Sequence, residues 1–193
     1  ERFALSNPEI RFTFITDGKT KIQTSGNGQV KNNIYYIFGA EITKSMIEVD
    51  YKSQDLHVTG YIGKPEISRG NRGYMNYFIN GRYIKSPVVA KAIEEAFHPY
   101  AMSHRYPFTL LFLDMDSSHL DVNVHPTKME VRFSNHEEVF DTIYQGLSQA
   151  IKQSLLIPQV PLEEKKEKPP VVTEPARPTI EPFETKFEQQ VAQ

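Results

Sequence analysis

The chain has 193 residues, with 22 lysines and arginines, 24 aspartates and glutamates, and no cysteine. This length allows one well-packed core, or one core followed by a tail. The lack of cysteine excludes a disulfide framework and a thiolate metal site, and it is compatible with a reducing cytoplasm. A formal net charge of −2 does not make a general nucleic-acid binder, and no apolar run approaches membrane-spanning length.

The first forty residues predict small elements. A short lead occupies residues 1–8, and alternation over 10–15, a turn at Asp17-Gly18 and a return over 21–24 then predict a surface hairpin. Apolar residues at helical spacing between Val30 and Phe38, followed by a glycine, predict a short helix.

The middle of the chain predicts two neighbouring strands over 46–51 and 56–62, and a third over 74–79 that ends in an Asn-Gly turn. Ser86 and Pro87 supply the cap and the first turn of a helix that ends near Pro99. An apolar run over 107–115 predicts a central strand.

The last part predicts a capping box and a long helix. Ser134 is expected to cap the helix while Glu137 reaches back, and an amphipathic stripe continues to about Ser154. Beyond it, seven of the thirteen prolines fall within 158–193, which predicts a disordered linker rich in Pro, Glu and Lys. Strands interleaved with three helices predict an α+β fold, with a mixed sheet and helices packed mainly on one face.

In residues 121–133, side chains expected on the core face and on the open face alternate, and the alternation is interrupted around Pro126. After it, Met129, Val131 and Phe133 are expected on the core face, and Glu130 and Arg132 on the open face. Pro126 has no N–H and forces the chain to leave the ladder, which puts Lys128 on an exposed turn. Such a lysine is a point charge suited to a phosphate, or else one more solvated lysine.

This run, Asp-Val-Asn-Val-His-Pro-Thr-Lys-Met-Glu-Val-Arg-Phe, resembles the signature of the MutL family of DNA mismatch-repair proteins. Further matches precede it in the same order, and together they cover about residues 1–155. They are Thr24-Ser25-Gly26-Asn27-Gly28, Ile37-Phe38-Gly39, Gly60-Tyr61-Ile62-Gly63-Lys64-Pro65, Asn71-Arg72 and Phe78-Ile79-Asn80-Gly81-Arg82-Tyr83.

The resemblance implies the ribosomal-protein-S-five-domain-two-like fold, which is the transducer domain of gyrase-type and MutL-type ATPases. Residues 1–8 would end an inter-domain connector, 9–157 would form the transducer domain and 158–193 would begin a linker. It also implies that Lys128 contacts the γ-phosphate of ATP in the preceding domain. The other residues assigned to the signature loop are Asn123, His125, Pro126 and Thr127.

The family's ATP-binding boxes are not in this sequence, so we expect no catalysis from these residues alone and no cofactor bound by them alone. The parent is expected to be an ATPase that uses ATP and Mg²⁺, dimerises through its N-terminal halves when ATP binds, and works with a MutS-type mismatch sensor. By the same resemblance it would be cytoplasmic, bacterial and associated with the nucleoid during repair, with no membrane partner.

A local basic cluster gives a second hypothesis. Between Lys64 and Lys91 six basic residues stand against the single acid Glu66. Non-specific DNA binding is assigned to four of them, Arg69, Arg72, Arg82 and Lys85. The alternative to the transducer hypothesis is a stand-alone nucleic-acid or protein-binding module with no role in ATP turnover.

Three weaker patterns remain. Gln153, Leu156 and Pro158 have the spacing of peptides that dock on the bacterial replication clamp, although a helix that ends before a proline produces the same string. The six histidines have no recognisable zinc spacing, so no metal site is predicted. Asp121 and His125 could suggest an acid–base pair, but no serine has the setting of a nucleophile.

Overall fold

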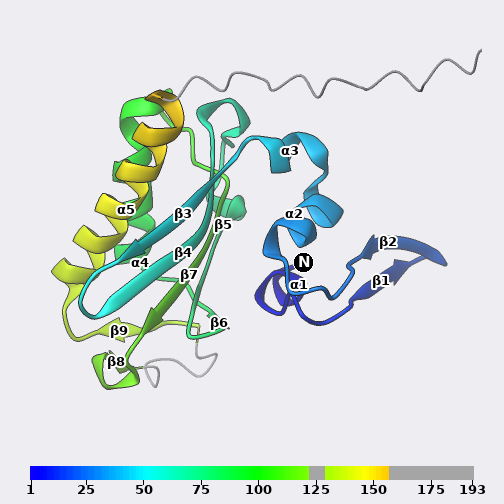
Figure 1. Cartoon of the computed structure of the whole chain (residues 1–193), viewed down its shortest axis with the longest axis horizontal. Coiled ribbons are helices and arrows are strands. Elements are labelled where there is room, and N and C mark those ends of the chain that lie inside the picture. Colours follow the sequence, from blue (N-terminus) through cyan, green and yellow to red (C-terminus); the bar gives the residue numbers. More distant parts are fainter. Residues whose placement is uncertain (122–128, 157–193) are drawn as a thin grey trace, which may run out of the picture. The chain divides into compact units, whose positions relative to one another are not determined.

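A five-stranded mixed sheet is the centre of the computed structural model, which describes residues 1–121 and 129–156 (Figure 1). The order across the sheet is β3 (Met46–Lys52), β4 (Leu56–Gly63), β7 (Thr109–Met115), β5 (Met75–Ile79) and β6 (Arg82–Tyr83). The β5–β7 pair is parallel and the other neighbouring pairs are antiparallel. The mixed sheet and the central position of β7 are confirmed.

Two long helices cover one face of this sheet, α4 (Pro87–Phe97) and α5 (His136–Leu156) (Figure 1). The predicted stripe of α5 is confirmed, because Val139, Ile143, Leu147 and Ile151 are buried in the core shared by the sheet and α4. Alternate residues of β4 and β7 point into the same core, which explains why these strands carry so many branched apolar side chains.

The predicted N-cap is confirmed for α4 but is wrong for α5. Ser86 caps α4 as expected, since its Oγ accepts a hydrogen bond from the Val89 N–H at 3.4 Å. The predicted cap of α5 is wrong by one residue: Asn135 Oδ1 accepts from the Glu138 N–H at 3.2 Å, and Asn135 Nδ2 donates to the Glu138 carboxylate at 3.2 Å. The Asn135 side chain therefore provides the cap that had been assigned to Ser134, and Glu138 bonds that side chain.

Short helices pack on the other face of the sheet. They are α1 (Arg2–Ser6), α2 (Val30–Phe38) and α3 (Ala40–Lys44). Leu5 and Ile34 are buried there against Phe78, Phe108 and Leu110. The predicted helix over 30–38 is confirmed, with Gly39 at a φ of +89° as its C-cap. The sequence prediction missed α3, because five residues are too few to display a helical period.

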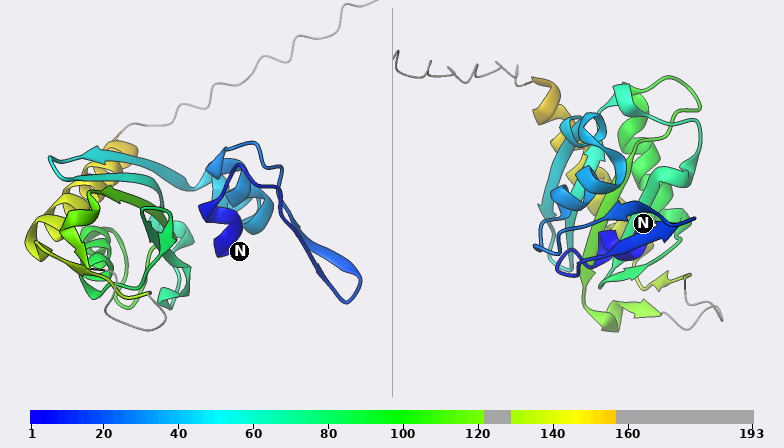
Figure 2. Two further views of the ribbon diagram at one scale, coloured as in Figure 1. Left: turned by 90° about the horizontal axis from the view of Figure 1, so that it is seen from below. Right: turned by 90° about the vertical axis from the view of Figure 1, so that its right-hand side faces the viewer.

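A separate two-stranded sheet precedes α2, formed by β1 (Thr13–Thr16) and β2 (Lys19–Gln23) (Figure 2). Asp17 and Gly18 have φ values of +52° and +71°, as a tight hairpin turn requires, so the predicted hairpin is confirmed. The remaining regular turns are short 3₁₀ helices at Pro65–Ile67, Arg72–Tyr74, His98–Tyr100 and Ser117–His119. No helix in the described ranges is long and apolar enough to cross a membrane.

Candidate functional site

The signature segment is anchored at both described flanks. Strand β8 (Leu120–Asp121) pairs antiparallel with β9 (Arg132–Phe133), and the Ser134 N–H donates to the His119 carbonyl at 3.0 Å. The 3₁₀ turn before β8 is closed by the Asp116 carboxylate, which accepts from the Ser118 N–H at 2.8 Å. That hydrogen bond lowers the pKa of Asp116 below its ordinary value. The described residues on both sides of 122–128 are therefore held by backbone pairing.

The loop between these flanks is outside the part of the chain that the structure describes. It contains five residues assigned to the signature, namely Asn123, His125, Pro126, Thr127 and Lys128. Val122 and Val124 of the same run are also outside the described residues. Their roles remain predictions.

The flank after the loop has the predicted alternation from Glu130 to Phe133, but Met129, also expected on the core face, is only half-buried and lies outside the main core. Val131 and Phe133 are buried in the main core, whereas Glu130 and Arg132 are exposed. The Lys85 N–H donates to the Met129 carbonyl at 2.7 Å, and Lys85 and Glu130 form a parallel bridge. The described parts of the signature form this small sheet and not a strand of the five-stranded sheet.

A groove opens between this flank and the start of α4. It has a volume of about 510 Å³, and its charged lining residues are Arg72, Lys85, Glu130 and Arg132. Lys85 and Arg72 were predicted site residues, but Arg132 had been placed only on an open strand face. The alternation in the sequence predicted that Arg132 is exposed, but it could not show that β9 lies beside Lys85.

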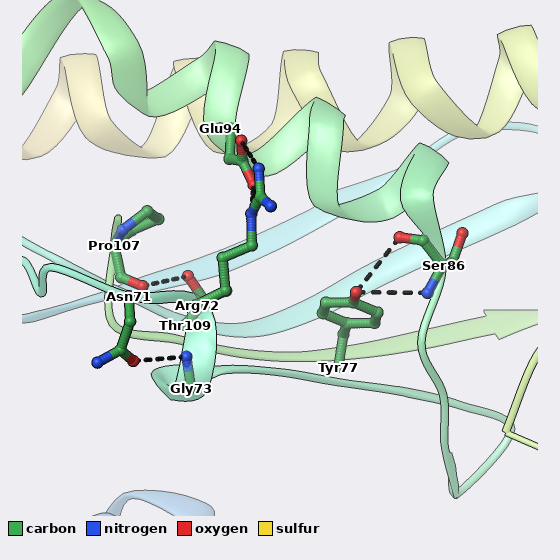
Figure 3. A network of polar contacts seen from close by, with 8 residues as sticks. All are labelled: Asn71, Arg72, Gly73, Tyr77, Ser86, Glu94, Pro107 and Thr109. Atoms are coloured by element: carbon green, nitrogen blue, oxygen red, sulfur yellow. Dashed lines mark hydrogen bonds and ion pairs between the residues drawn. The ribbon is translucent and has the colours of Figure 1, made fainter. Parts of the chain in front are cut away.

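Arg72 is held by an ion pair that links the 3₁₀ turn to α4 (Figure 3). Its Nε and Nη2 donate to the two carboxylate oxygens of Glu94 at 2.5 and 2.9 Å, and its guanidinium lies 5.1 Å from the centre of the Tyr106 ring. The hydrogen bond to Glu94, followed by the charge of Glu94, raises the pKa of Arg72. The fold thus adds Glu94 and Glu130 as counter-charges that the window from Lys64 to Lys91 did not contain.

The other two predicted DNA-binding residues lie elsewhere. Arg69 exchanges backbone hydrogen bonds of 2.8 Å with Tyr106 and lines a hollow of about 880 Å³. Arg82 is exposed on β6 and lines a hollow of about 810 Å³ with Met129. Arg2 lines both of these hollows and lies over the Tyr83 ring at 4.2 Å. The four residues therefore line three hollows, and Arg2 is a candidate that sequence reasoning missed because it lies outside the basic window.

Tyr77 is buried and lines the groove, and its hydroxyl meets Ser86 at the start of α4 (Figure 3). Its hydroxyl accepts from the Ser86 N–H and donates to the Ser86 carbonyl, both at 3.3 Å. Burial raises the pKa of Tyr77 above its ordinary value of 10.0. This residue therefore joins β5 to the first turn of α4, which carries the groove wall.

We expect Tyr77→Phe to lower the free energy of unfolding by about 1–2 kcal/mol, because the buried Ser86 N–H loses its acceptor. The raised pKa means that the neutral hydroxyl stabilises the fold at pH values below 10, and this contribution is lost as pH rises through the folded-state pKa. The difference in stability between the two proteins should therefore shrink above pH 10. Urea unfolding at pH 8 and at several values above 10 measures it, and a constant difference would contradict the role of the hydroxyl.

The possible clamp string lies at the end of α5. Gln153 is exposed and Leu156 is the last helical residue, while Pro158 is outside the described residues. The clamp hypothesis therefore remains a prediction. Within residues 1–121 and 129–156, no three His, Asp or Glu side chains gather as a metal site would require.

Comparison with known proteins identifies the architecture. A crystal structure of the N-terminal domain of a DNA repair protein superposes with a TM-score of 0.67 at 24% identity, covering 81% of this chain and 53% of that one. A point-mutated MutL ATPase domain from Aquifex aeolicus superposes with a TM-score of 0.52 at 15% identity, covering 76% and 47% of the two chains. The fold is thus the transducer type found in MutL-like ATPases.

The sequence gives the family. Residues 34–152 match the model of the DNA mismatch repair protein C-terminal domain. The DNA mismatch repair protein MutL of Agathobacter rectalis is 50% identical over 188 residues, which are 95% of this chain and 28% of that protein. The chain belongs to the MutL family of DNA mismatch repair proteins. It spans between 24% and 30% of the length of the curated relatives that it matches.

Proposed function

We propose that this chain is the transducer domain in the ATPase half of a MutL-type mismatch repair protein, and that Lys128 contacts the γ-phosphate of ATP bound by the preceding domain. The observation that carries the proposal is the anchoring of the flank next to Lys128, with Met129 bonded to the Lys85 backbone and Val131 and Phe133 buried. A lysine mounted on such a flank can be positioned by the whole domain. ATP turnover of a longer protein with Lys128→Ala tests this role.

The chemistry asked of Lys128 is limited. Its ammonium group stabilises negative charge on the transferring phosphoryl group, and the remaining donors and the Mg²⁺ ion belong to the preceding domain. Contact between this lysine and the nucleotide would couple ATP binding to the position of this domain and to N-terminal dimerisation. We also propose, for the longer protein, that it works with a MutS-type sensor, that it acts in bacterial nucleoid-associated repair and that it docks on a replication clamp.

The DNA contact belongs to the same proposal. Arg82 and Lys85 are exposed on the connection between β5 and α4. Arg69 is held by backbone hydrogen bonds to Tyr106, and Arg72 is held by its ion pair with Glu94. Arginines that contact phosphates give affinity without sequence preference, and that affinity falls as salt rises. Arg82 is the best test residue, because no ion pair with Arg82 occurs among the described residues.

We expect Arg82→Glu in the longer protein to weaken binding to a DNA duplex several-fold and to reduce the slope of log affinity against log salt by about one. Fluorescence anisotropy at several salt concentrations measures both quantities. The matched control is Lys152→Glu, the same change of charge at an exposed position on α5. Equal losses in both variants would assign the effect to net charge, and an unchanged Arg82→Glu would remove Arg82 from the DNA surface.

The alternative, a stand-alone binding module, predicts a different pair of results. Such a module would bind DNA through its basic residues, but Lys128→Ala would leave ATP turnover of any longer protein unchanged. Measuring turnover and DNA affinity on the same variants therefore separates the two functions.

A further inference from the structure

Glu94 lies on α4 just beyond the groove and is not one of the residues that line it. Ser86 and Ala90 line the groove from α4, and Glu94 follows Ala90 by one helical turn on the same face. Arg72 lines the groove and reaches from there to Glu94 (Figure 3). A ligand in the groove therefore meets Arg72 directly, whereas Glu94 acts on the ligand through Arg72.

The ion pair occupies one edge of the Arg72 guanidinium. Nε and Nη2 donate to the two carboxylate oxygens of Glu94 at 2.5 and 2.9 Å. This bidentate geometry is the one in which arginine binds either a carboxylate or a phosphate. The N–H groups best suited to hold a phosphate are thus already used by a carboxylate of the protein.

The same ion pair is of little importance for folding. The side chains of Arg72 and Glu94 are 63% and 27% exposed, and pairs in contact with water add little stability because solvent screens them. The packing of α4 comes instead from apolar side chains in the main core, among them Val89, Ile93 and Phe97. The charge of Glu94 can therefore be removed without unfolding the helix.

The formal charge of the groove depends strongly on Glu94. The groove is lined by three bases, Arg72, Lys85 and Arg132, against the single acid Glu130, which gives a formal charge of +2. With Glu94 beside Arg72, the formal charge falls to +1. Each phosphate that a basic residue neutralises steepens the dependence of log affinity on log salt by about 0.9. One internal counter-charge is therefore enough to change the affinity of this groove for DNA.

We propose that Glu94 limits the affinity of the groove for the phosphates of DNA by holding Arg72 in an internal ion pair. A phosphate that enters beside Arg72 competes with the Glu94 carboxylate for the same N–H groups. The groove then binds DNA more weakly than its three bases would allow. This inference rests on the proposed function only in taking DNA as the ligand.

Glu94→Gln in the longer protein tests the inference, because glutamine keeps the shape of the side chain and removes its charge. We expect the affinity for a DNA duplex to rise about eightfold at about 0.1 M salt, and the salt slope to steepen by about 0.9, since Arg72 then neutralises one more phosphate. Fluorescence anisotropy at several salt concentrations measures both quantities. The thermal midpoint should shift by a few degrees at most.

The matched control is Glu95→Gln, at the next position on α4. Glu95 also pairs with a base, since Lys91 Nζ lies 3.6 Å from its carboxylate, but neither residue lines the groove. Its affinity should change by about twofold or less, because solvent screens charges that do not touch the ligand. Adding Arg72→Gln to Glu94→Gln should abolish the gain.

Three results would overturn the proposal. Equal gains in Glu94→Gln and Glu95→Gln would assign the effect to net charge. A gain that survives the addition of Arg72→Gln would show that Glu94 acts on another group. Weaker binding by Glu94→Gln would show that the carboxylate positions Arg72 for DNA instead of competing with it.

The DNA surface and the role of Glu94 can fail separately. If Arg82→Glu weakens binding while Glu94→Gln and Glu95→Gln behave alike, the DNA surface stands and the role of Glu94 is rejected. If Arg82→Glu changes nothing while Glu94→Gln binds more tightly than Glu95→Gln, the groove remains the phosphate site and Arg82 is removed from it.

Discussion

Lys128→Ala is expected to lower ATP turnover of the longer protein by about a hundred- to a thousandfold, the scale of losing one preorganised donor to a developing negative charge. The folded domain should be unaffected, because the neighbouring anchors are Val131, Phe133 and the backbone of Met129. The measurement is steady-state phosphate release, with the free energy of unfolding determined alongside. A lower kcat at unchanged KM would mean that the contact acts in the transition state.

Two comparisons make that result specific. Lys152→Ala removes a lysine from an exposed position on α5 and should leave turnover unchanged. Lys128→Arg keeps the charge but changes its shape, so partial activity is expected from a point-charge contact. Turnover that is the same in Lys128→Ala and in the unmodified protein would reject the phosphate role and favour the binding module.

Gly60→Ala should be the most destabilising of the substitutions proposed for this chain, at about 3–5 kcal/mol. Gly60 lies in β4 between Val49 of β3 and Leu111 of β7, and its φ is +126°, a region that residues with a side chain rarely adopt. A Cβ at this position would fall on the carbonyl oxygen of Leu110. Because that oxygen belongs to the central strand, neither backbone can move without breaking the ladder.

The matched control for this loss is Gly70→Ala. A Cβ at Gly70 meets no atom within 4 Å, so its effect should stay within about 0.5 kcal/mol. Urea unfolding of the 193-residue chain measures both variants at pH 7. A Gly60→Ala protein as stable as the Gly70→Ala protein would show that β4 and β7 can separate locally at little cost.

Elements whose apolar residues recur at a regular spacing over a long stretch could be predicted from the sequence. The 21 residues of α5 show a helical stripe several turns long, and β4 and β7 combine apolar runs with clear turn residues at their ends. The Asp17-Gly18 and Asn80-Gly81 turns were predictable because few dipeptides adopt two successive positive φ values. In each case the residues that predict the element are neighbours in sequence, and the interactions that form it are between those neighbours.

The charge environment of the candidate site could not be predicted in the same way. Glu94 neutralises Arg72 from the last turns of α4, and Arg132 lies beside Lys85 because β9 approaches the start of that helix. Both relations depend on how elements pack across the fold, which no periodicity records. The choice of Asn135 over Ser134 as the cap of α5 is a smaller case, since both residue types favour that position.

The parallel pair β5–β7 also has a kinetic consequence. Met75 pairs with Thr109 across a crossover that contains β6 and α4, whereas β3 and β4 are joined by a tight turn. Closing the long crossover loses more chain entropy before its contacts form. The β3–β4 hairpin can therefore form early, while the groove wall made by β6 and α4 is completed only when β5 pairs with β7.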